Sequence, residues 1–412
     1  MTLPNRLAKS PMSEGLGDRY NAPTDRLARL YRRWSASGAG LLVTGNVMVD
    51  PAALGEPGNV VVSDDRDLEA LRSWAGAATS GGGQAWVQIN HPGRQVVRGL
   101  NAQAVAPSAV GAVAGNGGVF ATPRALTAPE IHALVARFAR TARIVVDAGF
   151  TGVQIHAAHG YLISQFLSPL VNRRTDDWGG TPEKRRRFLL EIVRAVRGEI
   201  GPAVPLGVKL NSADFQRGGM TEDESAEVVL ALAGEGIDLL EISGGTYESA
   251  AMMGVPAEPR KASTRAREAY FLDYAERVRA LTSTASSTGT GSAGPGATLP
   301  LMLSGGFRTA AAMSEAITSG AVDLIGLGRP LALEPDLPQR LLDGAATAST
   351  VRPRRTGIAR IDGASETAWY TVQLWRMADG KDPDPRGHPV LNLARYAAAA
   401  GLQGLRRKHR AA

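Results

Sequence analysis

The run Gly-Val-Gln-Ile-His at residues 152–156 is short and mostly apolar, and it lies between two longer segments patterned as amphipathic helices. The segment before it begins with a capping box at Thr127 and reaches Gly149, a residue that suits the end of a helix. The segment after it begins at Thr181, directly before a proline. Helices that alternate with a short buried strand are typical of βα units around a parallel sheet.

The same alternation runs along most of the chain. We expect eight strands, each followed by a helical stretch, at residues 6–11, 40–44, 84–89, 152–156, 205–210, 238–242, 300–304 and 323–327. A doubly wound sheet usually has about five to seven strands and a Gly-rich turn after its first strand. Here the first strand is followed by Pro11-Met12-Ser13. The pattern therefore predicts a single (β/α)8 TIM barrel in the α/β class, a fold that 412 residues accommodate with insertions.

Three segments depart from this pattern. Residues 90–126 form a long connection after the third strand, on the catalytic face of the barrel, where we expect a lid. Residues 283–298 are low in complexity, and we expect a flexible insertion without a chemical role. We assign the barrel to residues 1–345 and expect residues 346–412 to form an extension that packs on the barrel or on a neighbouring subunit.

The composition limits the chemistry. The chain has no cysteine, which excludes disulfides, iron–sulfur clusters, thiolate zinc sites and a cysteine nucleophile. Any redox chemistry must therefore be carried by a bound organic cofactor.

Charge and hydropathy suggest which partners to expect. The formal charge of +7 lies partly in basic runs at 184–187, 352–355 and 406–410. Because these runs are not interleaved with aromatic residues, we interpret them as solvated helix faces and a tail, without a nucleic-acid partner. No apolar stretch is long enough to cross a membrane, and the first residues have no signal-peptide core. We expect a cytoplasmic protein whose positive charge favours anionic ligands such as phosphate.

The ends of the expected strands carry the candidate site residues, because reactive groups of a barrel gather there. In chain order they are Pro11, Met12, Ser13, Gly45, Gln88, His156, His159, Tyr161, Lys209, Gly305, Gly306, Gly328 and Arg329. The glycine turns after the seventh and eighth strands can bring backbone N–H groups to a phosphate, although glycine also ends strands in ordinary turns. Lys209 lies in an apolar strand, so it either has an anionic partner or reaches solvent from the strand end.

Four motifs carry a resemblance to a known family. They are Val-Gln-Ile-Asn-His-Pro-Gly-Arg-Gln at 87–95, the stretch from 152 to 180, Leu-Ser-Gly-Gly-Phe-Arg at 303–308 and Gly-Leu-Gly-Arg-Pro at 326–330. Over residues 1 to about 345 the chain resembles the Old Yellow Enzyme family of NADH:flavin oxidoreductases, in which FMN-dependent ene-reductases are found.

The resemblance implies bound FMN. The two glycine turns and Arg329 would hold its phosphate, and Gln88 would bond the pyrimidine edge of the flavin. Lys209, where many members carry arginine, would stabilise the negative charge of reduced flavin. Ser13 would lie beside the C4 oxygen, Gly45 against the ring, and Pro11 and Met12 in the same cofactor-binding loop.

For the pair His156 and His159, three interpretations compete. They are a metal site, a packed structural pair, and two N–H donors that hold the carbonyl oxygen of a substrate. The resemblance favours the third, with Tyr161 as proton donor. It implies hydride transfer from NADH or NADPH through FMN to the C=C bond of an α,β-unsaturated carbonyl compound. It also implies a homo-oligomer. The alternatives are dienoyl-type reduction or demethylation at the same site, a flavin-binding barrel without turnover, and a metal-dependent hydrolase.

Overall fold

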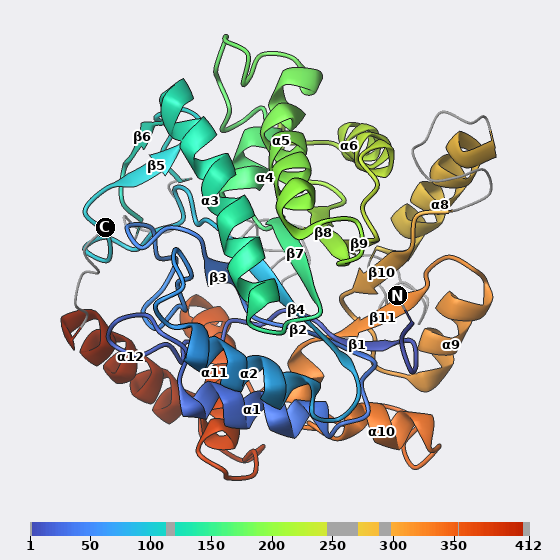
Figure 1. The fold of residues 1–412 in the computed structure, drawn as a ribbon. Helices are drawn as coiled ribbons and strands as arrows, with labels where there is room; N and C mark the ends of the chain where they lie inside the picture. The colour runs from blue at the N-terminus through green and yellow to red at the C-terminus, as the bar shows by residue number, and fades with distance from the viewer. Residues whose placement is uncertain (1, 113–119, 245–270, 288–297, 353, 407–412) are drawn as a thin grey trace.

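The core of the protein is a closed barrel of parallel strands, seen in a computed structural model that describes residues 2–112, 120–244, 271–287, 298–352 and 354–406 (Figure 1). The barrel strands are β1 (Leu7–Lys9), β2 (Leu41–Val43), β4 (Gln84–Asn90), β7 (Gly152–Ala157), β8 (Leu206–Asn211), β9 (Leu239–Ser243), β10 (Leu301–Ser304) and β11 (Leu324–Leu327). They pair in the order β2-β1-β11-β10-β9-β8-β7-β4, and a pairing between β2 and β4 closes the ring. Each predicted strand overlaps one of these, so the predicted barrel is confirmed.

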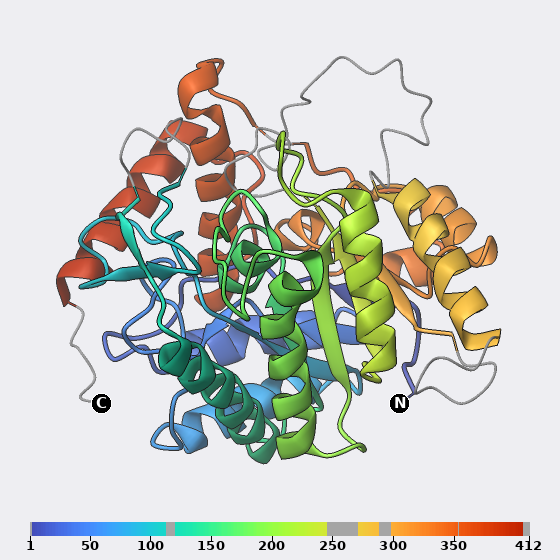
Figure 2. The ribbon, with the colours of Figure 1, turned by 90° about the horizontal axis from the view of Figure 1, so that it is seen from above.

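Helices surround the barrel, and their starts follow from local sequence (Figures 1 and 2). They are α1 (Asp25–Ser35), α2 (Leu68–Thr79), α3 (Ala128–Asp147), α4 (Leu162–Leu167), α5 (Pro182–Ile200), α6 (Glu222–Gly234), α8 (Leu272–Ser287), α9 (Ala310–Thr318), the 3-10 helix η2 (Arg329–Ala332) and α10 (Leu337–Leu342). The predicted capping box at Thr127 is present, since its side chain accepts from the backbone N–H of Glu130 while the Glu130 carboxylate accepts from that of Thr127.

One layer of the barrel is filled by buried apolar side chains of the barrel strands. This plug consists of Ala8, Leu41, Val43, Trp86, Leu239, Met302 and Leu324. Trp86 fits because two neighbouring strands carry glycine. A Cβ atom at Gly152 would lie 2.5 Å from Trp86 Nε1, and one at Gly207 would lie 2.8 Å from its Cζ3. A ligand of the barrel must therefore bind at the carboxyl ends of the strands.

The C-terminal helices α11 (Ala359–Ala378) and α12 (Pro389–Arg406) lie beside α1 and the N-terminal loops, red against blue in Figures 1 and 2. Trp375 Nε1 donates to the carbonyl of Glu14 at 2.8 Å, and Gln403 Nε2 donates to that of Gly15 at 3.1 Å. Trp369 is buried in the main core. The end of the chain thus contacts the backbone of the loop after β1.

Two other segments contain more regular structure than the sequence suggested. In the connection after β4, β5 (Ala104–Ala106) pairs with β6 (Pro123–Ala125), while residues 113–119 lie outside the described part. Residues 283–287 were expected to be flexible, but they complete α8, where Ser283 Oγ donates to the carbonyl of Arg279 at 2.8 Å. Most of the rest of the expected insertion, residues 288–297, lies outside the described part of the chain. The short β3 (Val47–Met48) pairs with the end of β4.

None of the helices in the described part of the chain combines the length and the apolar character that crossing a membrane requires.

Candidate active site

A ring of buried polar side chains lies directly above the apolar plug. We call it the lumen belt, and it consists of Ser10, Gln88, Gln154, Lys209, Glu241 and Ser304. Gln88 Nε2 donates to Gln154 Oε1 at 2.8 Å, and Gln154 Nε2 donates to Glu241 Oε2 at 2.8 Å. Ser304 Oγ donates to Glu241 Oε1, and Ser10 Oγ lies 2.6 Å from Ser304 Oγ. Five strands and the residue that follows β1 therefore contribute to one hydrogen-bonded network.

Lys209 finds its anionic partner within the protein. Its Nζ donates to Glu241 Oε1 at 2.7 Å, and the Lys209 and Glu241 side chains are 5% and 0% exposed. The sequence left open an anionic partner or a side chain that reaches solvent, and the resemblance implied the flavin as the partner. Sequence reasoning missed Glu241. Its signal was an acid in the apolar run Leu-Leu-Glu-Ile on the strand next to Lys209, where the two residues stand in register.

His156, His159 and Tyr161 form one aromatic cluster at the end of β7. The ring centroid of His156 lies 5.1 Å from that of His159 and 4.9 Å from that of Tyr161, both edge to face. His159 has φ 63° and Gly160 has φ 76°, so two consecutive left-handed residues turn the chain sharply between the strand and α4. The turn brings all three predicted catalytic side chains together.

Hydrogen bonds and burial define the protonation of the two histidines. The backbone N–H of Ala158 donates to His156 Nδ1 at 3.2 Å, so Nδ1 is an acceptor and the proton of the neutral ring is on Nε2. Burial lowers the pKa of His156 well below 6.5, and the charges of His159 and Lys209 act in the same direction. Burial, followed by the charge of Lys209, also lowers the pKa of His159 well below 6.5. Both rings are neutral at pH 7 and carry one N–H each.

His159 is held by its neighbours on the next two strands. Its backbone N–H donates to Asn211 Oδ1 at 3.1 Å, and its Nε2 lies 2.9 Å from Ser243 Oγ. The carbonyl of His159 accepts from Gln95 Nε2 at 2.9 Å, which connects the motif at 87–95 to the histidine turn. The turn is therefore fixed from the loop after β4 and from β8 and β9.

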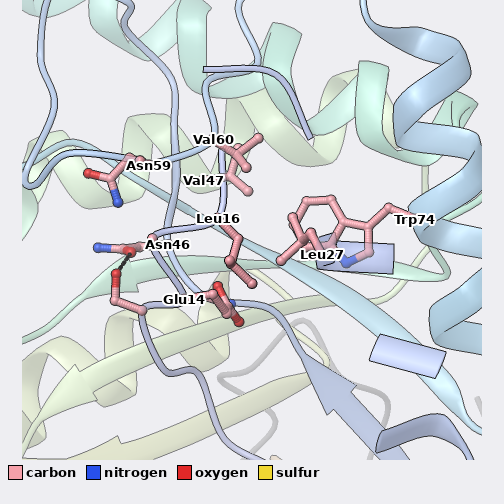
Figure 3. A pocket seen from close by; sticks show the side chains of 12 residues that line it. Glu14, Leu16, Leu27, Asn46, Val47, Asn59, Val60 and Trp74 are labelled. Carbon is pink, nitrogen blue, oxygen red and sulfur yellow. Dashed lines mark hydrogen bonds between the residues drawn. The ribbon is translucent and has the colours of Figure 1, made fainter. Parts of the chain in front are cut away.

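The loop after β1 passes between two glycines. A Cβ atom at Gly45 would lie 2.3 Å from the carbonyl oxygen of Met12, and one at Gly328 would lie 3.9 Å from Met12 Cγ. Met12 thus lies close to both glycines, and Pro11 precedes it in the same loop. Ser13 Oγ donates to Asn46 Oδ1 at 3.2 Å, the dashed bond in Figure 3. The structure brings these predicted cofactor-binding positions together.

A buried cluster of Lys9, Glu14 and Tyr31 anchors that loop from behind. Tyr31 Oη donates to Glu14 Oε1 at 2.5 Å, and Lys9 Nζ donates to Tyr31 Oη at 3.0 Å. The backbone N–H of Gly45 donates to Glu14 Oε1 at 3.1 Å. Burial lowers the pKa of Lys9 to about 8, against the opposing effect of the Glu14 carboxylate. These supporting residues carry no sequence motif and were not predicted.

Glu14 also lines a small polar pocket behind the loop (Figure 3). Leu16, Leu27, Val60 and Trp74 form its apolar side. A separate cleft of about 650 Å³ lies between residues 16–26, the loop at 54–58 and α12. Neither cavity is lined by the histidine cluster.

The predicted phosphate turns lie at the ends of neighbouring strands. Gly305 and Gly306 follow β10 with φ 123° and 86°, a region that favours glycine, and Gly328 follows β11, which pairs with β10. Arg329 Nη1 bonds Glu366 Oε1 of α11 at 2.8 Å, and the Arg329 side chain is 49% exposed. The charge of Arg329 is therefore already paired within the protein. The 3-10 helix η2 begins at the same residue.

The geometry fits a flavin. Among the described residues, Gln88 Oε1 has no hydrogen-bond partner, although Gln88 is 1% exposed. An acceptor of this kind suits the N3–H of an isoalloxazine, and Lys209 suits its negative charge. The described residues contain no group of three or more His, Asp or Glu side chains placed to hold a metal ion.

Comparisons with known proteins agree with this site. A model of the NADH:flavin oxidoreductase / NADH oxidase family matches residues 1–348. The chain is 37% identical over 360 residues to the NADH-dependent flavin oxidoreductase iliE of Hypocrea jecorina (strain QM6a), covering 83% of this chain and 86% of that protein. It is 34% identical over 409 residues to iccE of Talaromyces variabilis, covering 92% and 95%.

Solved structures give the same result. The Old Yellow Enzyme homologue from Zymomonas mobilis superposes with a TM-score of 0.68 at 27% identity, covering 85% of this chain and 92% of that one. Morphinone reductase superposes with a TM-score of 0.67 at 26% identity, covering 86% and 89%. The chain therefore belongs to the NADH:flavin oxidoreductase / NADH oxidase family and is an FMN-dependent NAD(P)H oxidoreductase.

Proposed function

We propose that the enzyme reduces the C=C bond of an α,β-unsaturated carbonyl compound or a related electron-poor alkene. The observation that carries this proposal is the neutral histidine pair beside a phenol at the end of β7. Two N–H donors fit a carbonyl oxygen on which negative charge develops, and a phenol fits the delivery of one proton. Bound FMN supplies the hydride, which comes from NADH or NADPH.

The chain's own residues divide the remaining work. His156 Nε2–H and an N–H of His159 hold the substrate oxygen and stabilise the enolate charge as it forms. Tyr161 donates its hydroxyl proton to the α-carbon, on the face opposite to the one that receives hydride. Because both rings are neutral, they polarise the carbonyl without transferring their own protons to it.

The cofactor is held at three places. Gln88 and Lys209 would bond the pyrimidine end of the flavin, and Pro11, Met12, Ser13 and Gly45 would form the wall along the ring. The backbone of the turns at Gly305-Gly306 and Gly328-Arg329 holds the phosphate. Positive φ at the paired glycines supports this role, since only glycine readily adopts it and a residue without a Cβ lets the backbone come close to a phosphate.

The test is a visible spectrum of the purified protein followed by anaerobic titration with NADH and with NADPH. We expect a flavin spectrum, its bleaching by at least one of the nucleotides, and its return on addition of 2-cyclohexenone. A protein that binds FMN but is not reduced by either nucleotide would contradict the proposal and leave a flavin-binding barrel without turnover.

Assembly and location also belong to the proposal. We propose a homo-oligomer that acts on small molecules in the cytoplasm. Light scattering coupled to size-exclusion chromatography measures the mass in solution, and a mass of about 43.2 kDa would contradict the oligomer. Cell fractionation with an antibody to the chain tests the location.

A further inference from the structure

Glu241 is completely buried and has no place in the reaction described above, yet it is the centre of the lumen belt. It accepts from Gln154 Nε2 at 2.8 Å, from Lys209 Nζ at 2.7 Å and from Ser304 Oγ. An ionised carboxylate can only accept hydrogen bonds, so every partner must present a donor to it. Lys209 Nζ lies at ion-pair distance from this carboxylate, 2.7 Å from Glu241 Oε1.

This requirement determines the orientation of two side-chain amides, one after the other. Gln154 must turn its NH2 group toward Glu241, so its Oε1 faces Gln88. Gln88 must then turn its own NH2 group toward Gln154, which leaves Gln88 Oε1 as an acceptor without a partner among the described residues. Glutamine amides are ordinarily ambiguous, because either end can be a donor or an acceptor site. The Glu241 carboxylate therefore fixes the orientation of both amides, that of Gln154 directly and that of Gln88 through Gln154.

We propose that Glu241 is a positioning residue that, through Gln154, makes Gln88 present its oxygen to the flavin. The pyrimidine edge of a flavin has one donor, N3–H, between two carbonyl acceptors. With the observed orientation, Gln88 Oε1 matches N3–H and the second hydrogen of Gln88 Nε2 matches a neighbouring carbonyl. The reversed amide would bring NH2 against N3–H. The proposal rests on the assignment of Gln88 to FMN in the proposed function.

The same carboxylate also sets the charge below the flavin. Lys209 on β8 stands in register with Glu241 on β9 and with His156 on β7, so it connects the belt to the histidine cluster. Paired with Glu241, its positive charge is largely balanced. Without that partner the cation acts fully on the flavin, and reduction, which adds negative charge, becomes more favourable.

Two variants separate the two effects. In Glu241→Gln the amide can both donate and accept, so Gln88 is free to reverse and the charge of Lys209 is unbalanced. We expect the dissociation constant of FMN to rise by roughly 2- to 10-fold, as for the loss of one hydrogen bond, and the midpoint potential to shift to more positive values. In Gln154→Met the relay is broken but the ion pair remains. We expect the same loss of affinity with the wild-type potential.

Asp238→Asn is the matched control. Asp238 precedes the same strand but faces outward, where it accepts from Arg197 Nη2 at 2.6 Å and from the backbone N–H of Leu206 at 2.8 Å. This variant removes a carboxylate three positions away without touching the belt. We expect it to keep the FMN affinity and potential of the wild type, whatever it costs in stability.

The measurements are FMN affinity, from flavin fluorescence on titration of apoprotein, and midpoint potential, from equilibration with a reference dye. Wild-type affinity in Gln154→Met would overturn the relay, and an unshifted potential in Glu241→Gln would overturn the charge effect. If Glu241→Gln does not fold, Gln154→Met decides the relay. Glu241→Asp retains the negative charge and should therefore retain the wild-type potential, so a shifted potential in this variant would overturn the charge effect. Failure of the wild-type protein to bind FMN is a separate result, which contradicts the proposed function.

Discussion

Replacing His156 by leucine tests the proposed chemistry most directly. The variant loses the Nε2–H donor, and removing one donor of this kind costs about 10²- to 10³-fold in rate, or about 2.7–4 kcal/mol. It also leaves the backbone N–H of Ala158, now bonded to His156 Nδ1 at 3.2 Å, without that acceptor. Since His156 is 3% exposed, we expect a loss of about 1–3 kcal/mol in the free energy of unfolding.

His156→Asn separates these two losses. The asparagine Oδ1 occupies the place of His156 Nδ1, so it can still accept from Ala158, while the donor at the Nε2 position is absent. We expect most of the stability to return and the rate to stay low. A common fall of rate and stability in the leucine variant, followed by recovery of both in the asparagine variant, would show that His156 is only structural.

The assay must measure the two half-reactions separately. Stopped-flow absorbance under nitrogen follows flavin bleaching by NADH or NADPH and, in a second experiment, flavin reoxidation by 2-cyclohexenone. We expect the main loss in reoxidation. The reasoning is refuted if His156→Leu is reoxidised by the alkene at the wild-type rate.

Three further results follow from the structure. Tyr161→Phe should reoxidise with 2-cyclohexenone about 10²- to 10⁴-fold more slowly while flavin reduction by nucleotide is retained, and an equal fall in both half-reactions would contradict a proton-donor role. Burial lowers the pKa of His156 and of His159 well below 6.5, so the rate of alkene-driven reoxidation between pH 5.5 and 8 should show no inflection near pH 6.5. An inflection that is present in the wild type and disappears in His159→Gln would contradict this. Burial, with the charge of Glu14, raises the pKa of Glu56 to about 7, so its contribution to stability is present below pH 4.5 and is lost as pH rises toward 7. Glu56→Gln should therefore gain in melting temperature relative to the wild type from pH 4.5 to 7, as scanning fluorimetry can measure, and a constant difference would count against the raised pKa.

The barrel was predictable because each strand is a short apolar run between helix signals. The exact ends of the strands and helices were less predictable. The first strand was expected at 6–11 but forms only at Leu7–Lys9, because Pro11 has no N–H for the ladder. The positions at 283–287 were misjudged because Ser and Thr are typical of linkers, whereas here Ser283 and Thr284 bond helix carbonyls of the preceding turn.

The candidate site could be predicted as a set of residues but not as a network. Parallel strands bring their carboxyl ends together, which is why His156, Gln88 and Lys209 were expected near one another. The pairing of Lys209 with Glu241 depends on the register between two strands 32 residues apart. The ion pair of Arg329 with α11 depends on how the C-terminal extension docks. Neither of these two ion pairs can be predicted from the sequence around one of its partners.

The loop after β1 cannot reach its final form until β11, α11 and α12 have been synthesised. β1 pairs with β11, and the carbonyls of Glu14 and Gly15 accept from side chains 361 and 388 positions later. The ribosome makes these partners long after the loop, so the loop waits for α11 and α12. Firm capture of the cofactor should therefore begin only after both helices have emerged, and a nascent chain stalled before α11 would lack the contacts that hold this loop.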